Sequence, residues 1–283
     1  MLALTRIWQP NARARALVAV CLILMAKHQY FSFETTEDHL SDGVNDAWVV
    51  TAQSIARANS DISPYLLPNE YICGTIGVFL GLTIPPFAIM RKSRRSKPMF
   101  ASLHFGRGDA APNDAIPERC WGSDPKTCTG IMLFDILVAN SDRHSGNIKV
   151  DNPIEPKQIR VFDHDRALLG IEQNDGHRQV FRRLKELKNR LGISKGSKSG
   201  GNECCFLPVA NTSQYFAHWL NRINQIPDWF IDDTCKSAVG LGITSRVANA
   251  AAEFLKYRKA NEGSIIDRHR DCFPNIRDWG LIT

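Results

Sequence analysis

The chain has 283 residues, of which 43% are hydrophobic and 23% charged, and its formal net charge is +6. This length and apolar content favour one sizeable core, or two lobes around a cleft, and exclude a largely disordered chain. The positive charge is spread among many carboxylates, so it is only a weak indication of a polyanionic partner such as ATP or nucleic acid.

The cysteines and the N-terminal residues indicate the compartment. The eight cysteines form no Cys-x-x-Cys pair and no zinc-finger spacing, so we expect free thiols in a reducing, cytoplasmic environment. The apolar run Ala16–Met25 follows two arginines, as in a signal-peptide core, but it is too short to span a bilayer. No small-x-small cleavage site follows it, so we expect a buried strand or a non-native extension and assign residues 1–26 to an N-terminal extension.

The first part of the chain predicts a small α+β lobe over residues 27–98. Asp42–Val50 is typical of a turn followed by a β-branched strand. A helix follows, with Asn69 as its N-cap and Gly81 as its stop. Thr83–Met90 contains two prolines, which exclude a helix and suit an edge strand.

The next elements are better defined by their apolar residues. The basic segment Arg91–Pro98 has no apolar face and predicts an exposed loop or hinge, with a nucleic-acid patch as the alternative. Lys126–Ala139 predicts a deeply buried helix, and Asn147–Val150 with Ile159–Phe162 predicts a hairpin. His177–Leu191 is helical, with apolar residues on one side and a solvated basic face on the other.

The remainder predicts a mainly helical second lobe over residues 99–283. Gly196–Asn202 is a loop by composition, and Ser213–Glu262 is typical of two or three amphipathic helices. The residues expected in their core are Trp219, Ile223, Trp229, Val247, Phe254 and Leu255. The predicted fold class is therefore α+β in two lobes, with a cleft between them.

Three oxygen-bearing side chains stand out between these apolar elements. Asp142 and Asn147 lie in the loop after the buried helix, and Asp163 ends the second strand of the hairpin. Such a frame would hold these side chains rigidly around one cavity, as phosphoryl transfer requires. One carboxylate can take a proton from an acceptor hydroxyl. An amide oxygen and a second carboxylate suit Mg²⁺, whose other ligands are water and phosphate oxygens.

The segments Asn140–Asn147 and Val161–His164 resemble the catalytic loop of the HipA-like kinases, which share its logic with phosphatidylinositol kinases. The resemblance implies a protein-kinase-like fold and Mg²⁺-dependent phosphoryl transfer from ATP to a hydroxyl, on a serine or threonine of a protein substrate. It also allows for a regulatory, antitoxin-like partner. The implied roles are a catalytic base (Asp142), magnesium ligands (Asn147 and Asp163) and supports of the loop (Arg143 and His144).

The small lobe matches the family less closely. By the same resemblance, Glu70 at the start of the helix would pair with a strand lysine that grips the nucleotide. The family usually has Val-Val-Lys there, whereas Thr51 follows the two valines in this chain. Losing that cation would remove transition-state stabilisation. The candidates for its replacement are Lys27, Lys92 and Arg57.

Two other functions are compatible with the sequence. The missing lysine favours a catalytically weak pseudokinase that binds a nucleotide or a partner protein. Alternation of aspartate and histidine suits a metal-dependent phosphoesterase built on Asp142, His144, Asp163 and His164. Structural roles are expected for Asp165, and for Asp135, which we expect to bond a loop amide.

Overall fold

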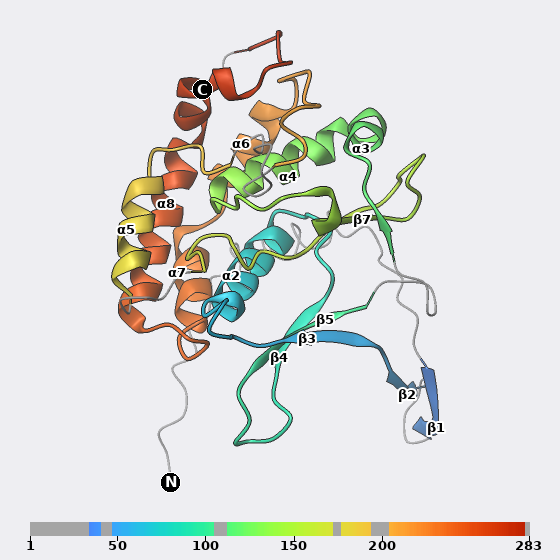
Figure 1. Cartoon of the computed structure of the whole chain (residues 1–283). Coiled ribbons are helices and arrows are strands. Elements are labelled where there is room, and N and C mark those ends of the chain that lie inside the picture. The colour runs from blue at the N-terminus through green and yellow to red at the C-terminus, as the bar shows by residue number, and fades with distance from the viewer. Residues whose placement is uncertain (1–33, 41–46, 105–111, 172–176, 194–203, 281–283) are drawn as a thin grey trace, which may run out of the picture.

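The computed structural model describes residues 34–40, 47–104, 112–171, 177–193 and 204–280. Within these ranges the protein is an α+β structure with seven α-helices and three small antiparallel sheets (Figure 1). The expected extension 1–26, Lys27 and the expected loop Gly196–Asn202 lie outside the described residues.

Two of the sheets come from the first part of the chain. β1 (Glu34–Leu40) pairs with β2 (Ala47–Thr51), which is the strand predicted within Asp42–Val50. β3 (Ser54–Arg57), β5 (Met99–Leu103) and β4 (Phe87–Met90) form the second sheet in that order, so β4 is an edge strand as predicted. This sheet includes residues on both sides of the lobe boundary expected at residue 98.

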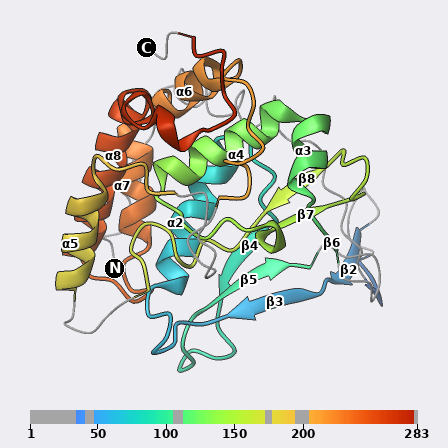
Figure 2. The same ribbon diagram turned by 45° about the horizontal axis from the view of Figure 1, so that its top comes forward.

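Helix α2 (Leu66–Phe79) lies between the β3–β5–β4 sheet and α7 (Asp228–Ser237), as two views show (Figures 1 and 2). It begins earlier than predicted, because Pro68 is tolerated in a first turn, where backbone N–H groups have no helical partner. The prediction of Asn69 as N-cap is therefore wrong. Gly81, with φ of +72°, follows the end of the helix as predicted, and its N–H donates to Val78 O.

The third sheet lies next to the candidate site. β6 (Asn113–Asp114), β7 (Ile148–Val150) and β8 (Ile159–Val161) are adjacent in that order, and β7 with β8 is the predicted hairpin. Ile148 faces Val161 across the pair, and both are fully buried. The Arg91–Pro98 segment links β4 to β5 and is largely exposed, as expected for a loop.

Helix α4 (Pro125–Leu137) is the central element of the helical part. It packs against α3 (Pro117–Ser123), α6 (Phe216–Asn224) and α8 (Ser245–Arg268), and is buried on all sides as its apolar run predicts. Asp124 caps it by accepting from Thr127 N at 2.9 Å. Beyond its end at Leu137, Ala139 has a φ of +50°, and Asn140 N donates to Asp135 O.

The helices predicted after the hairpin are confirmed, with one exception among their expected core residues. α5 (Arg178–Leu187) buries Val180 and Leu184, and α6, α7 and α8 occupy the region expected to hold two or three helices. The predicted core residues are buried apart from Trp229, which is 37% exposed. Trp229 lies in the first turn of α7, edge-on to Phe230, so its placement in the core was wrong.

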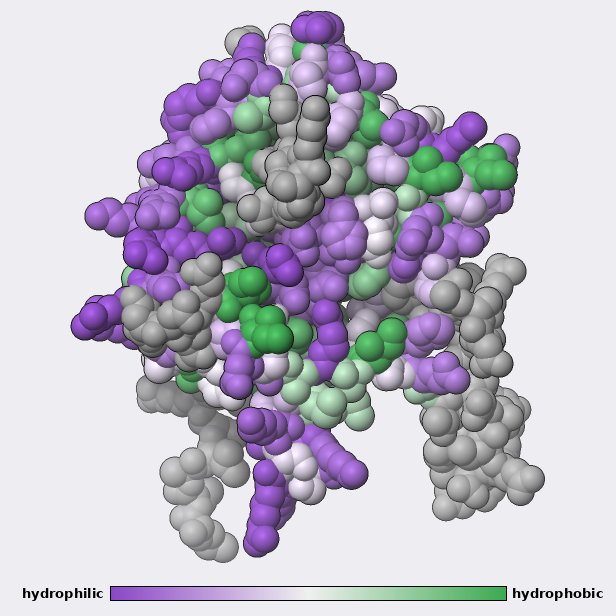
Figure 3. All heavy atoms as spheres, in the orientation of Figure 1, coloured by the Kyte–Doolittle hydropathy of each residue, from purple (hydrophilic) through white to green (hydrophobic). Residues whose placement is uncertain are grey.

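The face seen in Figure 3 is mainly hydrophilic, with hydrophobic side chains in small separate groups. Among the described residues, no helix combines the length and the apolar character needed to cross a membrane.

Candidate active site

The loop after α4 is anchored by Arg143, which is fully buried. Its guanidinium donates to both carboxylate oxygens of Asp135, at 2.9 and 3.1 Å. Its Nη1 also donates to Asn147 O at 3.0 Å and to Phe162 O at 2.6 Å. One side chain therefore ties the loop to α4, to the residue before β7 and to the residue after β8. Removing one partner of such a buried pair costs about 3–5 kcal/mol.

Asn147 and Asp142 are held within the same loop. Asn147 is buried, and its side-chain Nδ2 donates to Asp142 O at 2.8 Å. This hydrogen bond does not use the side-chain oxygen of Asn147. The Asp142 carboxylate is partly exposed and pairs with Arg166 Nε at 3.4 Å. His144 is exposed and accepts from Gly146 N at 3.1 Å, so it stabilises the turn before Asn147.

Asp163 follows β8 in an uncommon backbone conformation, with φ of +61°. A non-glycine residue rarely adopts this left-handed conformation, although aspartate does so more readily than most. Pairing of Ile148 with Val161 brings Asn147 beside Phe162, and Phe162 N donates to Asn147 O at 3.4 Å. The side chains of the predicted metal ligands Asn147 and Asp163 therefore extend from neighbouring backbone segments.

Arg57, the last residue of β3, joins the two predicted nucleotide-site carboxylates. Its Nη1 donates to Asp163 Oδ1 at 3.0 Å, and its Nη2 forms an ion pair with Glu70 Oε1. The other oxygen of Glu70 lies 3.3 Å from His164 Nδ1. Glu70 and His164 are both buried, so this cluster binds β3, α2 and the segment after β8 to one another.

The pKa values in the cluster follow from burial and charge. Burial disfavours the charged form of Asp163, but the charge and hydrogen bond of Arg57 outweigh it and lower the pKa of this carboxyl. Burial, together with the charge of Asp163, raises the pKa of Asp165 to about 6. The pKa of Arg57 is raised by the charges of Glu70 and Asp163, which overcome the opposing effect of its burial. Arg57 is thus held as a permanent cation between carboxylates.

A cavity of about 270 Å³ opens beside this cluster, and Arg57, Glu70, Asp163 and His164 line it. The rest of its wall comes from the β3–β5–β4 sheet and neighbouring segments, mostly through apolar side chains. They include Ile55, Ile84, Phe100 and Phe162. Lys149 of β7 also reaches the cavity and is paired with Asp114. The wall of the cavity therefore combines apolar side chains with charged ones.

The structure brings together some of the predicted site residues and separates others. Glu70 and Asp163 meet through Arg57, and Arg143 and Asn147 meet in the loop. Asp142, Asn147 and His144 do not line the cavity that contains Asp163. Asp135 bonds the side-chain amide of Asn140 at 2.8 Å, as expected of a structural residue.

The sequence predicted Arg57 only as one of three candidates to replace the missing strand lysine. The available signal is that Arg57 is the only lysine or arginine between Lys27 and Arg91. Lys92 lies in the exposed β4–β5 loop, away from this cavity. Lys149 in the cavity wall was missed, because the residue two positions after Asn147 lies on a strand with no motif to mark it.

The two predicted metal ligands, of which only Asp163 lines the cavity, fit Mg²⁺ better than a transition metal. The carboxylate of Asp163 and the amide oxygen of Asn147 are hard oxygen ligands, and the surrounding carboxylates outnumber Arg57. Within the described ranges, no three side chains of His, Cys, Asp and Glu are grouped so that they could hold a metal ion by themselves. His144 and His164 are engaged by Gly146 and Glu70, respectively.

Comparison with known proteins adds no family assignment. No protein-family model matches the chain, and no curated protein sequence matches it.

Proposed function

We propose that this protein is a HipA-like kinase that transfers a phosphoryl group from ATP to a hydroxyl, on a serine or threonine of a protein. The observation that carries the proposal is the bridge from Arg57 to both Glu70 and Asp163 at the wall of the 270 Å³ cavity. This bridge supports the proposal because Arg57 offers a cation in place of the strand lysine that the chain lacks. The proposed two lobes are the β3–β5–β4 sheet with α2, and the helices around α4.

The lining of the cavity includes groups suited to the base and groups suited to the phosphates of a nucleotide. Ile55, Ile84, Phe100 and Phe162 offer an apolar environment suited to a purine ring. Arg57 lies on the same wall, opposite Phe100 across β3 and β5, and its guanidinium can contact phosphate oxygens. This arrangement would direct the phosphates toward Asp163.

In this proposal Asp163 and Asn147 hold Mg²⁺, which neutralises charge on the phosphates when bound. Arg143 positions the loop and does not touch the substrate, since its donors are used by Asp135, Asn147 and Phe162. Asp142 accepts the proton of the acceptor hydroxyl. Its partial exposure and its ion pair with Arg166 leave it at the edge of the loop, where an incoming protein can reach it.

The test is label transfer from ATP labelled at its terminal phosphate. Purified protein with Mg²⁺ should label itself or dephosphorylated casein, and Asp142→Ala should lower the rate about 100-fold or more. Asp233→Ala, which removes an exposed carboxylate from α7, is the matched control and should leave the rate unchanged. Equal rates for Asp142→Ala and the wild type would rule out the proposed base.

A pseudokinase is the second candidate, and the same ion pair favours it. Arg57 engages Asp163 Oδ1 directly, and an arginine fork holds a carboxylate more firmly than a lysine does. A protein in which Arg57 keeps Asp163 in this ion pair would bind Mg²⁺-ATP without transferring phosphate. A rise in melting temperature with Mg²⁺-ATP, together with no label transfer, would identify this case.

A further inference from the structure

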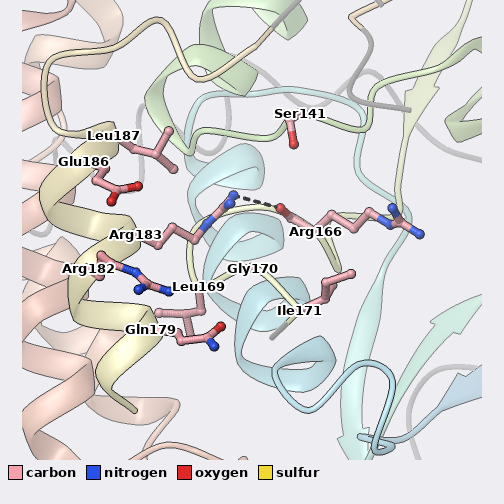
Figure 4. Close-up of a pocket in the computed structure, with 10 residues that line it drawn as sticks. All are labelled: Ser141, Arg166, Leu169, Gly170, Ile171, Gln179, Arg182, Arg183, Glu186 and Leu187. Carbon is pink, nitrogen blue, oxygen red and sulfur yellow. Dashed lines mark hydrogen bonds between the residues drawn. The ribbon is translucent and has the colours of Figure 1, made fainter. Parts of the chain in front are cut away.

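A second cavity, of about 340 Å³, lies between α5 and the segment that follows β8 (Figure 4). It shares no lining residue with the cavity that contains Arg57 and Asp163. We call it the arginine cavity. Its polar lining residues are Ser141, Arg166, Gln179, Arg182, Arg183 and Glu186. The guanidinium of Arg166 is directed away from α5 and pairs with Asp142 (Figure 4). The charge of the cavity therefore comes from Arg182 and Arg183 against Glu186, which leaves an excess of positive charge.

Two of the arginines have different surroundings. Arg183 donates to the carbonyls of Leu168, Ala139 and Arg166, at 3.2, 3.3 and 3.2 Å, so it holds the wall of the cavity in place. Arg182 is exposed, and among the described residues no carboxylate is ion-paired with it. Figure 4 shows its guanidinium directed into the cavity from α5. Arg182 is therefore positioned to meet a ligand.

The arginine cavity adjoins the proposed catalytic base. Ser141 directly precedes Asp142, and its hydroxyl points into the space shown in Figure 4. Arg166 lines the cavity and pairs with the Asp142 carboxylate at 3.4 Å. Asp142 itself does not line the arginine cavity, so a group bound here would lie beside Ser141, one residue before Asp142, whereas a nucleotide bound in the other cavity would lie next to Asp163.

We infer that the arginine cavity binds an oxyanion side chain of the protein acceptor, a phosphoserine or an acidic residue close to the hydroxyl that receives the phosphate. This inference rests on the proposed kinase function. Arginine is the side chain best suited to carboxylate and phosphate groups, because its planar donors match two oxygens at once. The Ser141 hydroxyl and the Gln179 amide supply further polar groups beside them.

Binding can be measured without ATP, by fluorescence anisotropy of labelled alanine-rich peptides that carry one serine and a nearby phosphoserine, glutamate or glutamine. The phosphoserine peptide should bind about tenfold more tightly than the glutamine peptide. Arg182→Ala should remove most of that preference. Lys185→Ala, which removes an exposed cation from the same helix outside the cavity, should leave it intact.

A second variant gives an effect of opposite sign, which misfolding cannot imitate. Glu186→Gln removes the carboxylate from the cavity wall and should tighten binding of the phosphoserine peptide about two- to fivefold. Equal losses for Arg182→Ala and Lys185→Ala would overturn the inference, since they would indicate general attraction to a basic helix. So would equal affinity for the three peptides, or displacement by a single-stranded oligonucleotide that is insensitive to Arg182→Ala.

The fate of the kinase proposal can be separated from that of the cavity. Selective peptide binding without label transfer would refute the kinase and leave an anion site. Label transfer with equal kcat/KM for the glutamate and glutamine peptides would refute the acceptor site and leave the kinase.

Discussion

At the scale of single residues, Arg57 shows how one side chain can define a site. A guanidinium presents donors in a fixed fork, so it can bind Glu70 with one nitrogen and Asp163 with another. Both carboxylates would be destabilised by their burial without this cation. The bridge therefore stabilises the contact between β3, α2 and the segment after β8, and it places positive charge in the cavity.

Substitution of Arg57 separates these two effects. Arg57→Ala should lower kcat/KM for ATP about 100-fold, by analogy with the loss of one donor to a transition-state oxyanion. It should also abolish the rise in melting temperature on adding Mg²⁺-ATP. Arg57→Lys keeps the charge and should retain much of both effects. Lys92→Ala, which removes the next lysine along the chain from an exposed loop, is the control. Wild-type behaviour of Arg57→Ala would exclude this residue as the nucleotide cation.

At the scale of elements, the position of the loop that contains Asp142 depends on how closely α4 packs against α6. Gly130 of α4 faces Trp219 of α6, and a Cβ at residue 130 would lie only 2.2 Å from Trp219 Cε2. Trp219 is also fixed by a hydrogen bond from its Nε1 to Lys126 O at 2.7 Å. The two helices thus approach each other through a glycine, and α4 leads directly into the loop at Asp142.

Replacement of this glycine should move the helices apart. Gly130→Ala should destabilise the protein by about 1–3 kcal/mol through overpacking, although alanine is the better helix former. Gly122→Ala in α3 is the matched control, because a Cβ there meets no atom within 4 Å. It should stabilise by about 0.5–1 kcal/mol. Urea unfolding with unchanged slope measures both, and stabilisation by Gly130→Ala would contradict the close approach of α4 and α6.

The elements also show what the sequence could and could not predict. The apolar run of α4 and the β7–β8 hairpin were predicted, because burial on all sides leaves an unambiguous pattern. The start of α2 was not, because Asn69 is as suitable for a cap as for its actual contacts with Asp165 O and Leu169 N. β3 has four residues, too few for a pattern, so Arg57 could be suggested as a cation but not placed. Such tertiary contacts have no local signal.

At the scale of the whole molecule, α8 unites the helices behind the site. Its Arg258 is fully buried and donates to the carbonyls of Ile136 and Leu137 at the end of α4. It also donates to Leu187 O at 2.6 Å and to Leu191 O at 2.9 Å, at and beyond the end of α5. One turn further along α8 lies Glu262, which is 1% exposed, with no hydrogen bond to either carboxylate oxygen among the described residues.

The burial of Glu262 predicts how the stability of the protein varies with pH. Burial raises the pKa of Glu262 to about 8, against the weaker opposing charge of Arg258. The pKa in the unfolded chain is about 4.3. Between these values the folded state binds the additional proton, so the contribution of this residue to stability falls as pH rises. The slope approaches 1.4 kcal/mol for each pH unit (order of magnitude) and vanishes above the folded pKa.

Glu262→Gln should therefore flatten the decline in unfolding free energy between about pH 5 and pH 8. The amide has nearly the same shape as the carboxyl and does not titrate in this range. Glu253→Gln, on an exposed position of the same helix, should leave the decline as in the wild type. Urea unfolding at intervals of one pH unit gives the three curves. Parallel curves for all three proteins would show that Glu262 is ionised in the folded state, and that α8 tolerates a buried charge beside Arg258.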